Sequence, residues 1–311
     1  MARLGLGEVF GLSPLSLRAR EAWIAVRGAS GVPPSRFDRS SLGILKPVLS
    51  VGTWLGHVRE DRRIPIYNLF NHTPTPIEDG WSVRKTQVRD FRGGTLTYDS
   101  HNGTDFVIPV GTVVTAAAPG KVLRVSSEFN RGGLKVFIDH GAGLATTSNH
   151  LARSLVSVGD VVRRGQRIAL SGYSGLDAVV AFPWSAPHVH FNVWLDGEYV
   201  DPFAAAGELP LWRDGNDPKP ASEADEPFAP TRWDARGLED AIAACTAPEI
   251  RDELAREAEL DRRAMNLLFQ RNYYPTRFSA RPRVIAEPAW RNPRLTLPFL
   301  PRDFDGITFE P

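Results

Sequence analysis

The chain has 311 residues, of which 42% are hydrophobic and 23% charged, the composition of a globular protein with a sizeable core. Its formal net charge of +1 mixes both signs, so composition gives no argument for binding nucleic acid or an anionic membrane surface. Cys245 is the only cysteine, which excludes an internal disulfide and a thiolate metal cluster.

The N-terminus lacks the apolar stretch of a signal peptide, because Glu8, Pro14, Arg18 and Arg20 interrupt it. We also find no run that is long and apolar enough for a transmembrane helix. On this criterion the sequence predicts a soluble, cytoplasmic protein with no transmembrane segment.

Residues 1–82 predict an N-terminal flank that packs on the core. A short helix is expected over residues 16–27, where Leu17, Trp23 and Val26 form a partial apolar stripe. Scattered aromatic residues and prolines follow, and they favour irregular structure with short strands in the rest of this flank.

Residues 83–206 have a different texture, because short apolar or alternating runs recur between glycine-rich turns such as Pro119–Gly120 and Gly132–Gly133. Short strands at this spacing are typical of an all-β domain built from antiparallel sheets. We therefore predict a mainly β fold with its core in this segment.

Residues 207–234 are rich in proline, glycine and acidic side chains, which is typical of a linker. Helical periodicity follows over residues 235–269, with an expected break near Ala247–Pro248. The chain then becomes rich in proline, arginine and aromatic residues, so we expect residues 235–311 to form a helix and an extended arm. We find no catalytic motif in this C-terminal third.

Two segments, residues 110–122 and 158–168, resemble the hybrid motif shared by biotinyl and lipoyl carrier domains and by some zinc peptidases. A carrier domain needs an exposed lysine at a hairpin tip to bear its cofactor. Lys121 and Lys135 lie instead within predicted strands, which disfavours a carrier domain.

The seven histidines become informative through their joint arrangement. His188 and His190 lie in a predicted strand, where side chains alternate between faces, so both imidazoles should project from the same face. His101 and Asp105 add one imidazole and one carboxylate, and Gly103 allows a tight backbone between them. Two imidazoles, a carboxylate and a water make a four-coordinate catalytic zinc site, and such ligands suit a chain without paired thiolates.

Three motifs within residues 99–203 resemble those of the lysostaphin/LytM-type zinc endopeptidases, whose fold is a duplicated hybrid motif with an open groove. The motifs are His101-x-Gly103-x-Asp105, His150-Leu151 and Pro187-His188-x-His190-Phe191. The resemblance implies that His101, Asp105 and His190 bind Zn²⁺. It also implies that His150 and His188 flank the attacking water, one of them as general base, and together stabilise the oxyanion and protonate the leaving amine.

The chain departs from the usual family pattern outside these five positions. Ser148 stands where an aromatic residue is common, and Asn192 stands where an acidic residue is frequent. Residues 176–186 are longer and more apolar than usual, and predict a loop beside the groove. His140 has no role in the family pattern, so we interpret it as structural.

The resemblance implies a zinc metallopeptidase that hydrolyses peptide bonds in peptidoglycan cross-bridges or stem peptides, an activity that usually belongs to the cell envelope. The alternative is a non-catalytic relative that binds the cell wall or activates amidases, but all five site positions are present. A zinc peptidase of the D-Ala-D-Ala type would need a Glu-x-x-His pairing, and none lies near His150 or His188. We therefore predict a metalloendopeptidase whose partner is a peptide or peptidoglycan.

Overall fold

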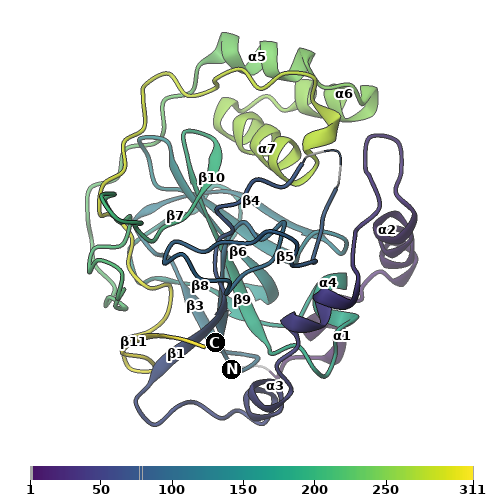
Figure 1. Ribbon diagram of the computed structural model, residues 1–311. Helices are drawn as coiled ribbons and strands as arrows, with labels where there is room; N and C mark the ends of the chain where they lie inside the picture. The colour runs from purple at the N-terminus through teal and green to yellow at the C-terminus, as the bar shows by residue number, and fades with distance from the viewer. Residues whose placement is uncertain (1–2, 77, 79, 311) are drawn as a thin grey trace.

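An eleven-stranded sheet runs through the computed structural model, which describes residues 3–76, 78 and 80–310 (Figure 1). The strands are β1 (Arg63–Asn68), β2 (Thr104–Val107), β3 (Val113–Thr115), β4 (Gly120–Glu128), β5 (Gly133–Asp139), β6 (Leu144–Ser154), β7 (Val161–Val162), β8 (Arg167–Ser171), β9 (His188–Leu195), β10 (Glu198–Val200) and β11 (Gly306–Phe309). Their order is β11-β1-β2-β9-β6-β5-β4-β7, with β10 on β9 and with β8 between β6 and β3. All these pairs are antiparallel except β1 with β11, so the predicted mainly β fold with an antiparallel core is confirmed.

The centre of the sheet brings three distant segments together, because β9 lies between β2 and β6. In the β2–β9 register Asp105 is the direct partner of His190, and Val107 is the partner of His188. Directly opposed residues of an antiparallel pair carry their side chains on the same face at short distance. Strand pairing alone therefore sets a carboxylate beside an imidazole.

Strand β9 divides its side chains between two faces of the sheet. Val189, Phe191 and Val193 are buried in one hydrophobic cluster, whereas Trp194 belongs to a second cluster that includes the C-terminal helices. His190 alternates with the first set and so faces the side of the second cluster. A slip of one residue would expose apolar side chains worth roughly 1.5–3 kcal/mol each, so the core fixes the register that presents the histidine.

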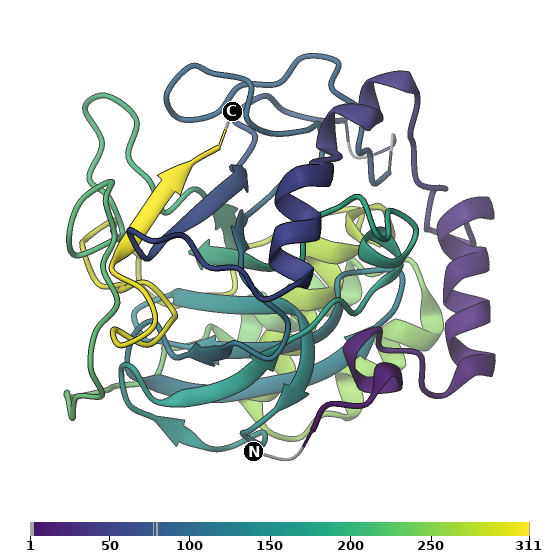
Figure 2. The same cartoon turned by 90° about the horizontal axis from the view of Figure 1, so that it is seen from below.

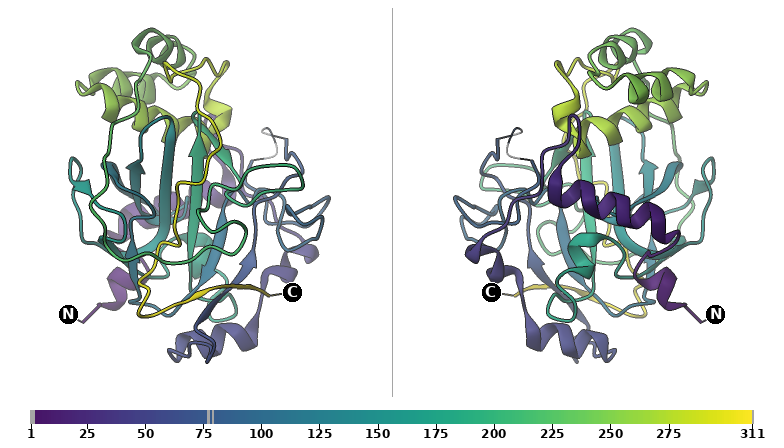
Figure 3. Two further views of the ribbon diagram at one scale, coloured as in Figure 1. Left: turned by 90° about the vertical axis from the view of Figure 1, so that its left-hand side faces the viewer. Right: turned by 90° about the vertical axis from the view of Figure 1, so that its right-hand side faces the viewer.

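Helices surround the sheet on two sides, with α5–α7 gathered over one end and α1–α3 beside another (Figures 1 and 3). The helices are α1 (Leu6–Val9), α2 (Leu15–Arg27), η1 (Arg39–Ile44), α3 (Pro47–Trp54), α4 (Leu176–Val179), α5 (Ala235–Ala243), α6 (Pro248–Arg256), α7 (Leu260–Tyr273) and η3 (Pro275–Arg277). The segment with predicted helical periodicity, residues 235–269, thus holds three helices. None of the helices in the described part of the chain is long and apolar enough to cross a membrane.

Helix α2 occupies nearly the predicted residues, but its predicted apolar stripe does not face the core. Leu17, Trp23 and Val26 are 42%, 62% and 57% exposed. The helix is held instead by Arg18, whose guanidinium donates to the carbonyl and the hydroxyl of Ser127 at 2.8 Å each. A buried arginine replaces the expected hydrophobic contact.

Both flanks contribute a strand to the sheet. Strand β1 comes from the proline-containing N-terminal segment, and β11 comes from the last residues of the C-terminal arm; they pair in parallel, side by side (Figure 2). The division into residues 1–82, 83–206, 207–234 and 235–311 stays a prediction.

Candidate metal centre and active site

Three buried side chains converge where β2, β9 and the turn before β2 meet. His101, Asp105 and His190 each offer one ligand atom, and these atoms lie within 4.8 Å of one another. Asp105 Oδ1 lies 3.1 Å from His101 Nε2 and 2.7 Å from His190 Nδ1, and the two nitrogens are 3.2 Å apart. Two imidazole nitrogens and a carboxylate oxygen turned toward one point are the donor set of a catalytic zinc site. The cluster can hold a metal ion.

Backbone geometry and a hydrogen bond orient His101. A Cβ atom on Gly103 would lie 2.7 Å from His190 Nε2 and from the Phe191 carbonyl, so glycine is required for this close approach of the turn to β9. His101 Nδ1 donates to the Leu69 carbonyl at 2.6 Å. In a neutral imidazole this leaves the Nε2 lone pair directed at the centre, the orientation that a metal ligand needs.

The Asp105 carboxylate is held as an anion. Burial alone would raise the pKa of this carboxyl, but the imidazoles of His101 and His188 and hydrogen bonds within the cluster hold it well below its usual range. Asn68 donates to the other carboxylate oxygen, Oδ2, at 2.9 Å. Oδ1 therefore remains for a cation.

A network of amide side chains reaches the second nitrogen of His190. His190 Nε2 lies 2.9 Å from Asn192 Nδ2 and 3.2 Å from Asn102 Oδ1. Asn149 Nδ2 donates to Asn192 Oδ1 at 2.8 Å, and the Tyr273 hydroxyl donates to Asn149 Oδ1 at 2.9 Å. Tyr273 ends α7, so the C-terminal third, in which the sequence shows no catalytic motif, contributes a side chain to this network.

The sequence carried only partial signals for this network. Asn192 stood out as a departure from the family pattern, and Asn149 precedes a candidate histidine. Tyr273 gave no signal, because only the folded sheet brings the end of α7 to β6 and β9.

His150 and His188 lie together beside the cluster. Their ring centroids are 4.7 Å apart, and His188 Nε2 lies 3.8 Å from Asp105 Oδ1. In both residues Nδ1 meets a backbone carbonyl, that of Ser174 at 2.7 Å for His150 and that of Ala186 at 2.8 Å for His188. Each Nδ1 thus carries the proton and each Nε2 is left to accept one.

Electrostatics and backbone strain distinguish these two histidines. Burial lowers the pKa of His188 to about 4, so its imidazole is neutral near pH 7. His150 has a φ of 60°, a conformation that costs a non-glycine residue free energy and occurs often at active sites. Its N–H donates to the Gly132 carbonyl at 2.9 Å, which holds this conformation.

The loop predicted over residues 176–186 lies beside His150 and His188 and contains α4. Asp177 Oδ2 comes within 3.5 Å of His150 Nε2. The Tyr173 hydroxyl donates to the Ser185 carbonyl at 2.8 Å, and Ser50 of α3 donates to the same carbonyl at 2.9 Å. The N-terminal flank therefore anchors this loop.

A pocket of about 180 Å³ opens beside the centre. Its lining residues are Val32, Pro33, Thr75, Pro76, Gly80, Trp81, Ser100, Asn102, Arg131, Asn272, Tyr273, Tyr274, Pro275 and Thr276. Asn102 joins this pocket to the candidate ligand His190. None of the five candidate site residues lines this pocket, and Asn102 is its contact with the centre.

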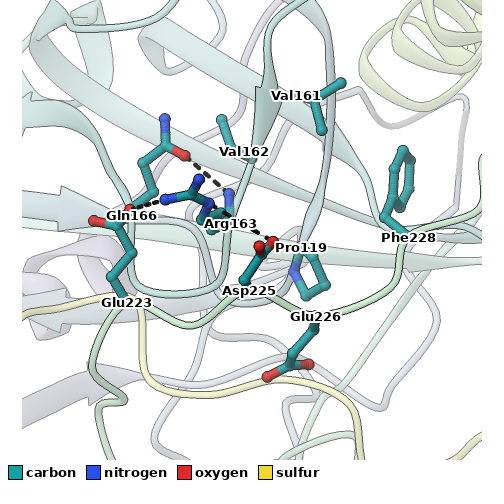
Figure 4. A pocket seen from close by; sticks show the side chains of 9 residues that line it. All are labelled: Pro119, Val161, Val162, Arg163, Gln166, Glu223, Asp225, Glu226 and Phe228. Atoms are coloured by element: carbon teal, nitrogen blue, oxygen red, sulfur yellow. Dashed lines mark hydrogen bonds and ion pairs between the residues drawn. The ribbon is translucent and has the colours of Figure 1, made fainter.

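A second pocket, of about 600 Å³, is shown in Figure 4 and lies at the β7 edge against residues 223–228. Strand β7 is separated from β6 by β5 and β4, and none of the five candidate site residues lines this pocket. Its charged groups pair with each other, since Arg163 Nη1 lies 3.3 Å from Glu223 Oε1. This pocket is separate from the metal centre.

Comparison with known proteins agrees with this geometry. Residues 99–202 match the model of Peptidase family M23. An uncharacterized metalloprotease of Haemophilus influenzae is 37% identical over 102 residues, which are 33% of this chain and 20% of that protein. The peptidoglycan DD-endopeptidase ShyB of Vibrio cholerae is 38% identical over 111 residues, which are 36% of this chain and 24% of that protein.

Solved structures with similar segments include a zinc-containing peptidase from Vibrio cholerae, with 32% identity and a TM-score of 0.35 over 49% of this chain and 39% of that one. Another is the catalytic domain of lysostaphin from Staphylococcus simulans, with 26% identity and a TM-score of 0.30 over 44% of this chain and 85% of that one. The chain spans only about a fifth to a quarter of the length of the curated relatives named above.

The segment with the His–Asp–His cluster is similar to domains of metallopeptidases. More specifically, residues 99–202 match Peptidase family M23, so the resemblance to the lysostaphin/LytM-type enzymes is confirmed. The structure brings all five candidate residues together, and their individual roles as ligands and proton-transfer groups stay predictions.

Proposed function

We propose that the protein is a zinc-dependent metalloendopeptidase that hydrolyses peptide bonds of peptidoglycan, in its stem peptides or cross-bridges. The observation that carries this proposal is the convergence of three ligand atoms within 4.8 Å, with two further imidazoles beside them.

His101, Asp105 and His190 would hold the zinc ion, one atom each. Zinc bound there supplies a Lewis acid that polarises a peptide carbonyl and activates water at neutral pH. Three protein ligands leave a coordination position open, which distinguishes a catalytic from a structural zinc site.

His150 and His188 would move the proton. Because their Nδ1 atoms donate to backbone carbonyls, each Nε2 can accept a proton from the attacking water and return it to the leaving amine. The pair can also donate to the negatively charged oxygen of the tetrahedral intermediate. The neutral state of His188 near pH 7 suits the accepting role.

The substrate assignment is supported by relatives named as peptidoglycan DD-endopeptidases, of which this chain covers 20–30% of the length. The pocket beside the centre agrees with a peptide substrate, since aromatic and polar side chains such as Trp81, Tyr273 and Asn102 line it. Aromatic walls with a few polar groups are typical of sites that bind small ligands and peptides.

Digestion of purified peptidoglycan by the zinc-loaded chain, with identification of the released peptides, tests the proposal. The wild-type chain should release cleaved stem peptides, and His188→Ala should bind zinc yet lose roughly 10²–10⁴-fold in rate, because it removes proton transfer and leaves the three ligands. His140→Gln is the matched control, since His140 is a buried histidine bonded to Pro119 and Thr146 away from the centre. Unchanged turnover in His188→Ala would refute its role, and no cleavage by the wild-type chain would favour a non-catalytic relative.

A further inference from the structure

Arg131 is a buried cation without a carboxylate partner. It lies in the turn between β4 and β5 and is 8% exposed. Its Nε donates to the Tyr273 carbonyl at 3.0 Å, and its Nη1 donates to the Asn130 carbonyl at 2.8 Å. It forms an ion pair with none of the carboxylates in the described part of the chain.

Such an arrangement is costly unless something compensates the charge. Burial lowers the pKa of Arg131, and the nearby Tyr274 and Asp177 oppose this shift without cancelling it. A buried charge that is not fully compensated destabilises a fold. Arg277 adds a like charge, because both guanidinium groups stack on the Tyr274 ring, at 4.9 Å for Arg131 and 4.2 Å for Arg277.

One edge of the Arg131 guanidinium remains available. The two carbonyl contacts use Nε and Nη1, and Nη2 has no protein acceptor among the described residues. Nη2 is also absent from the fully buried nitrogens that lack a partner, so it keeps some exposed surface, and Arg131 is one of the residues that line the pocket. The contact of Nε with the last carbonyl of α7 gives the side chain a structural role, but this role does not involve Nη2.

Two contacts connect Arg131 and its pocket with the candidate site residues. Its neighbour Gly132 accepts the N–H of His150, and Asn102 on the same pocket contacts His190. A group bound at Nη2 would therefore occupy the pocket that reaches His190 through Asn102.

We infer that Arg131 binds a free carboxylate of the peptide substrate close to the scissile bond, so that the protein selects substrates carrying such a carboxylate. This inference rests on the proposed function. Guanidinium and carboxylate groups match in charge and planar geometry, and the pair is strong where water is excluded. A neutral amide in place of the carboxylate would leave the buried charge uncompensated.

The test compares two forms of one substrate, a dimeric muropeptide and the same dimer after its free carboxylates are converted to amides. For the zinc-loaded wild-type chain kcat/KM should be roughly 10- to 100-fold higher on the carboxylate form, the effect of one charge-assisted contact. Arg131→Gln should lose this preference by slowing only on the carboxylate form, and Arg131→Lys should keep part of it. Arg277→Gln is the control, since it removes a guanidinium from the same tyrosine ring but not from the pocket.

A merely structural Arg131 would give a different pattern, with both forms slowed equally in Arg131→Gln. That result, or equal rates of the wild-type chain on both forms, would overturn the inference. Calorimetry of the binding of both dimers to His188→Ala tests the role of Arg131 separately from the proposed function. Tighter binding of the carboxylate form without any cleavage by the wild-type chain would support the Arg131 site and refute the peptidase activity. Cleavage of both forms at equal rates would support the peptidase activity and refute the Arg131 site.

Discussion

Replacement of Asn192 by alanine should weaken zinc binding without removing a ligand. The Asn192 carboxamide is fully buried, with its Nδ2 2.9 Å from His190 Nε2 and its Oδ1 accepting from Asn149 and Tyr273. His190 Nδ1 is the atom turned toward Asp105, so the contact at Nε2 sets how the ring presents its ligand nitrogen.

The expected magnitude follows from these contacts. Loss of a partner that orients a metal ligand typically costs 10- to 100-fold in affinity, which corresponds to about 1.4–2.7 kcal/mol. One or two buried hydrogen bonds at roughly 1 kcal/mol each give the same range. Tyr273→Phe acts on His190 only indirectly, through Asn192 and Asn149, so its effect on zinc affinity should be smaller than that of Asn192→Ala.

Zinc affinity can be measured by competition with a chromophoric chelator, and urea unfolding of the metal-free proteins reports stability separately. Asn272→Ala is the matched control, because it removes a carboxamide from α7 that donates to two backbone carbonyls and accepts from Arg281, none of them a candidate site residue. Its zinc affinity should equal that of the wild-type chain. If Asn192→Ala lowers stability but binds zinc as tightly as the control, the network is structural and the reasoning fails.

Two further predictions concern charge. Asp105→Ala should retain far less zinc than the roughly one ion per chain expected for a three-ligand site. Asp139→Ala is the control, because it removes a buried carboxylate outside the cluster and should retain the zinc. Elemental analysis measures the metal content of both variants, and equal content would refute the ligand role of Asp105. Burial lowers the pKa of His140 from 6.5 to about 3, so the unfolded chain gains a proton first and stability falls as pH drops below 6.5. Between pH 7 and pH 5 this group should lower the free energy of unfolding of the metal-free protein by about 2 kcal/mol. The free energy of unfolding of His140→Gln should fall by about 2 kcal/mol less over the same range. An equal fall in both proteins would contradict the buried neutral state of His140.

Much of the candidate site could be predicted because it depends on local rules. Period-two alternation puts His188 and His190 on the same face, and the fold has them there on β9. Gly103 was expected to allow a tight backbone, and a Cβ atom there would collide with β9. Such inferences need only the neighbours in sequence.

The remaining features depend on contacts between distant segments. The exposed face of α2 could not be foreseen, because the helix is held by Arg18 on Ser127, more than a hundred residues away. Likewise the link from Tyr273 to Asn149 requires α7 to lie across the sheet, which no periodicity within residues 260–273 encodes. Helical patterns predict that a face is buried, but not what it is buried against.

The flanking segments and residues 99–202 supply different parts of the site. All of its lining residues except Ser100, Asn102 and Arg131 lie outside residues 99–202, the part that matches the family. The metal cluster and the two adjacent histidines lie inside that part, so under the proposed function the chemistry would be common to the family. Most of the walls that meet the substrate would then come from outside the residues that match the family. Changes in the flanking segments should therefore alter which peptides are cleaved while leaving zinc binding intact, whereas changes at the five site positions should affect all peptides alike.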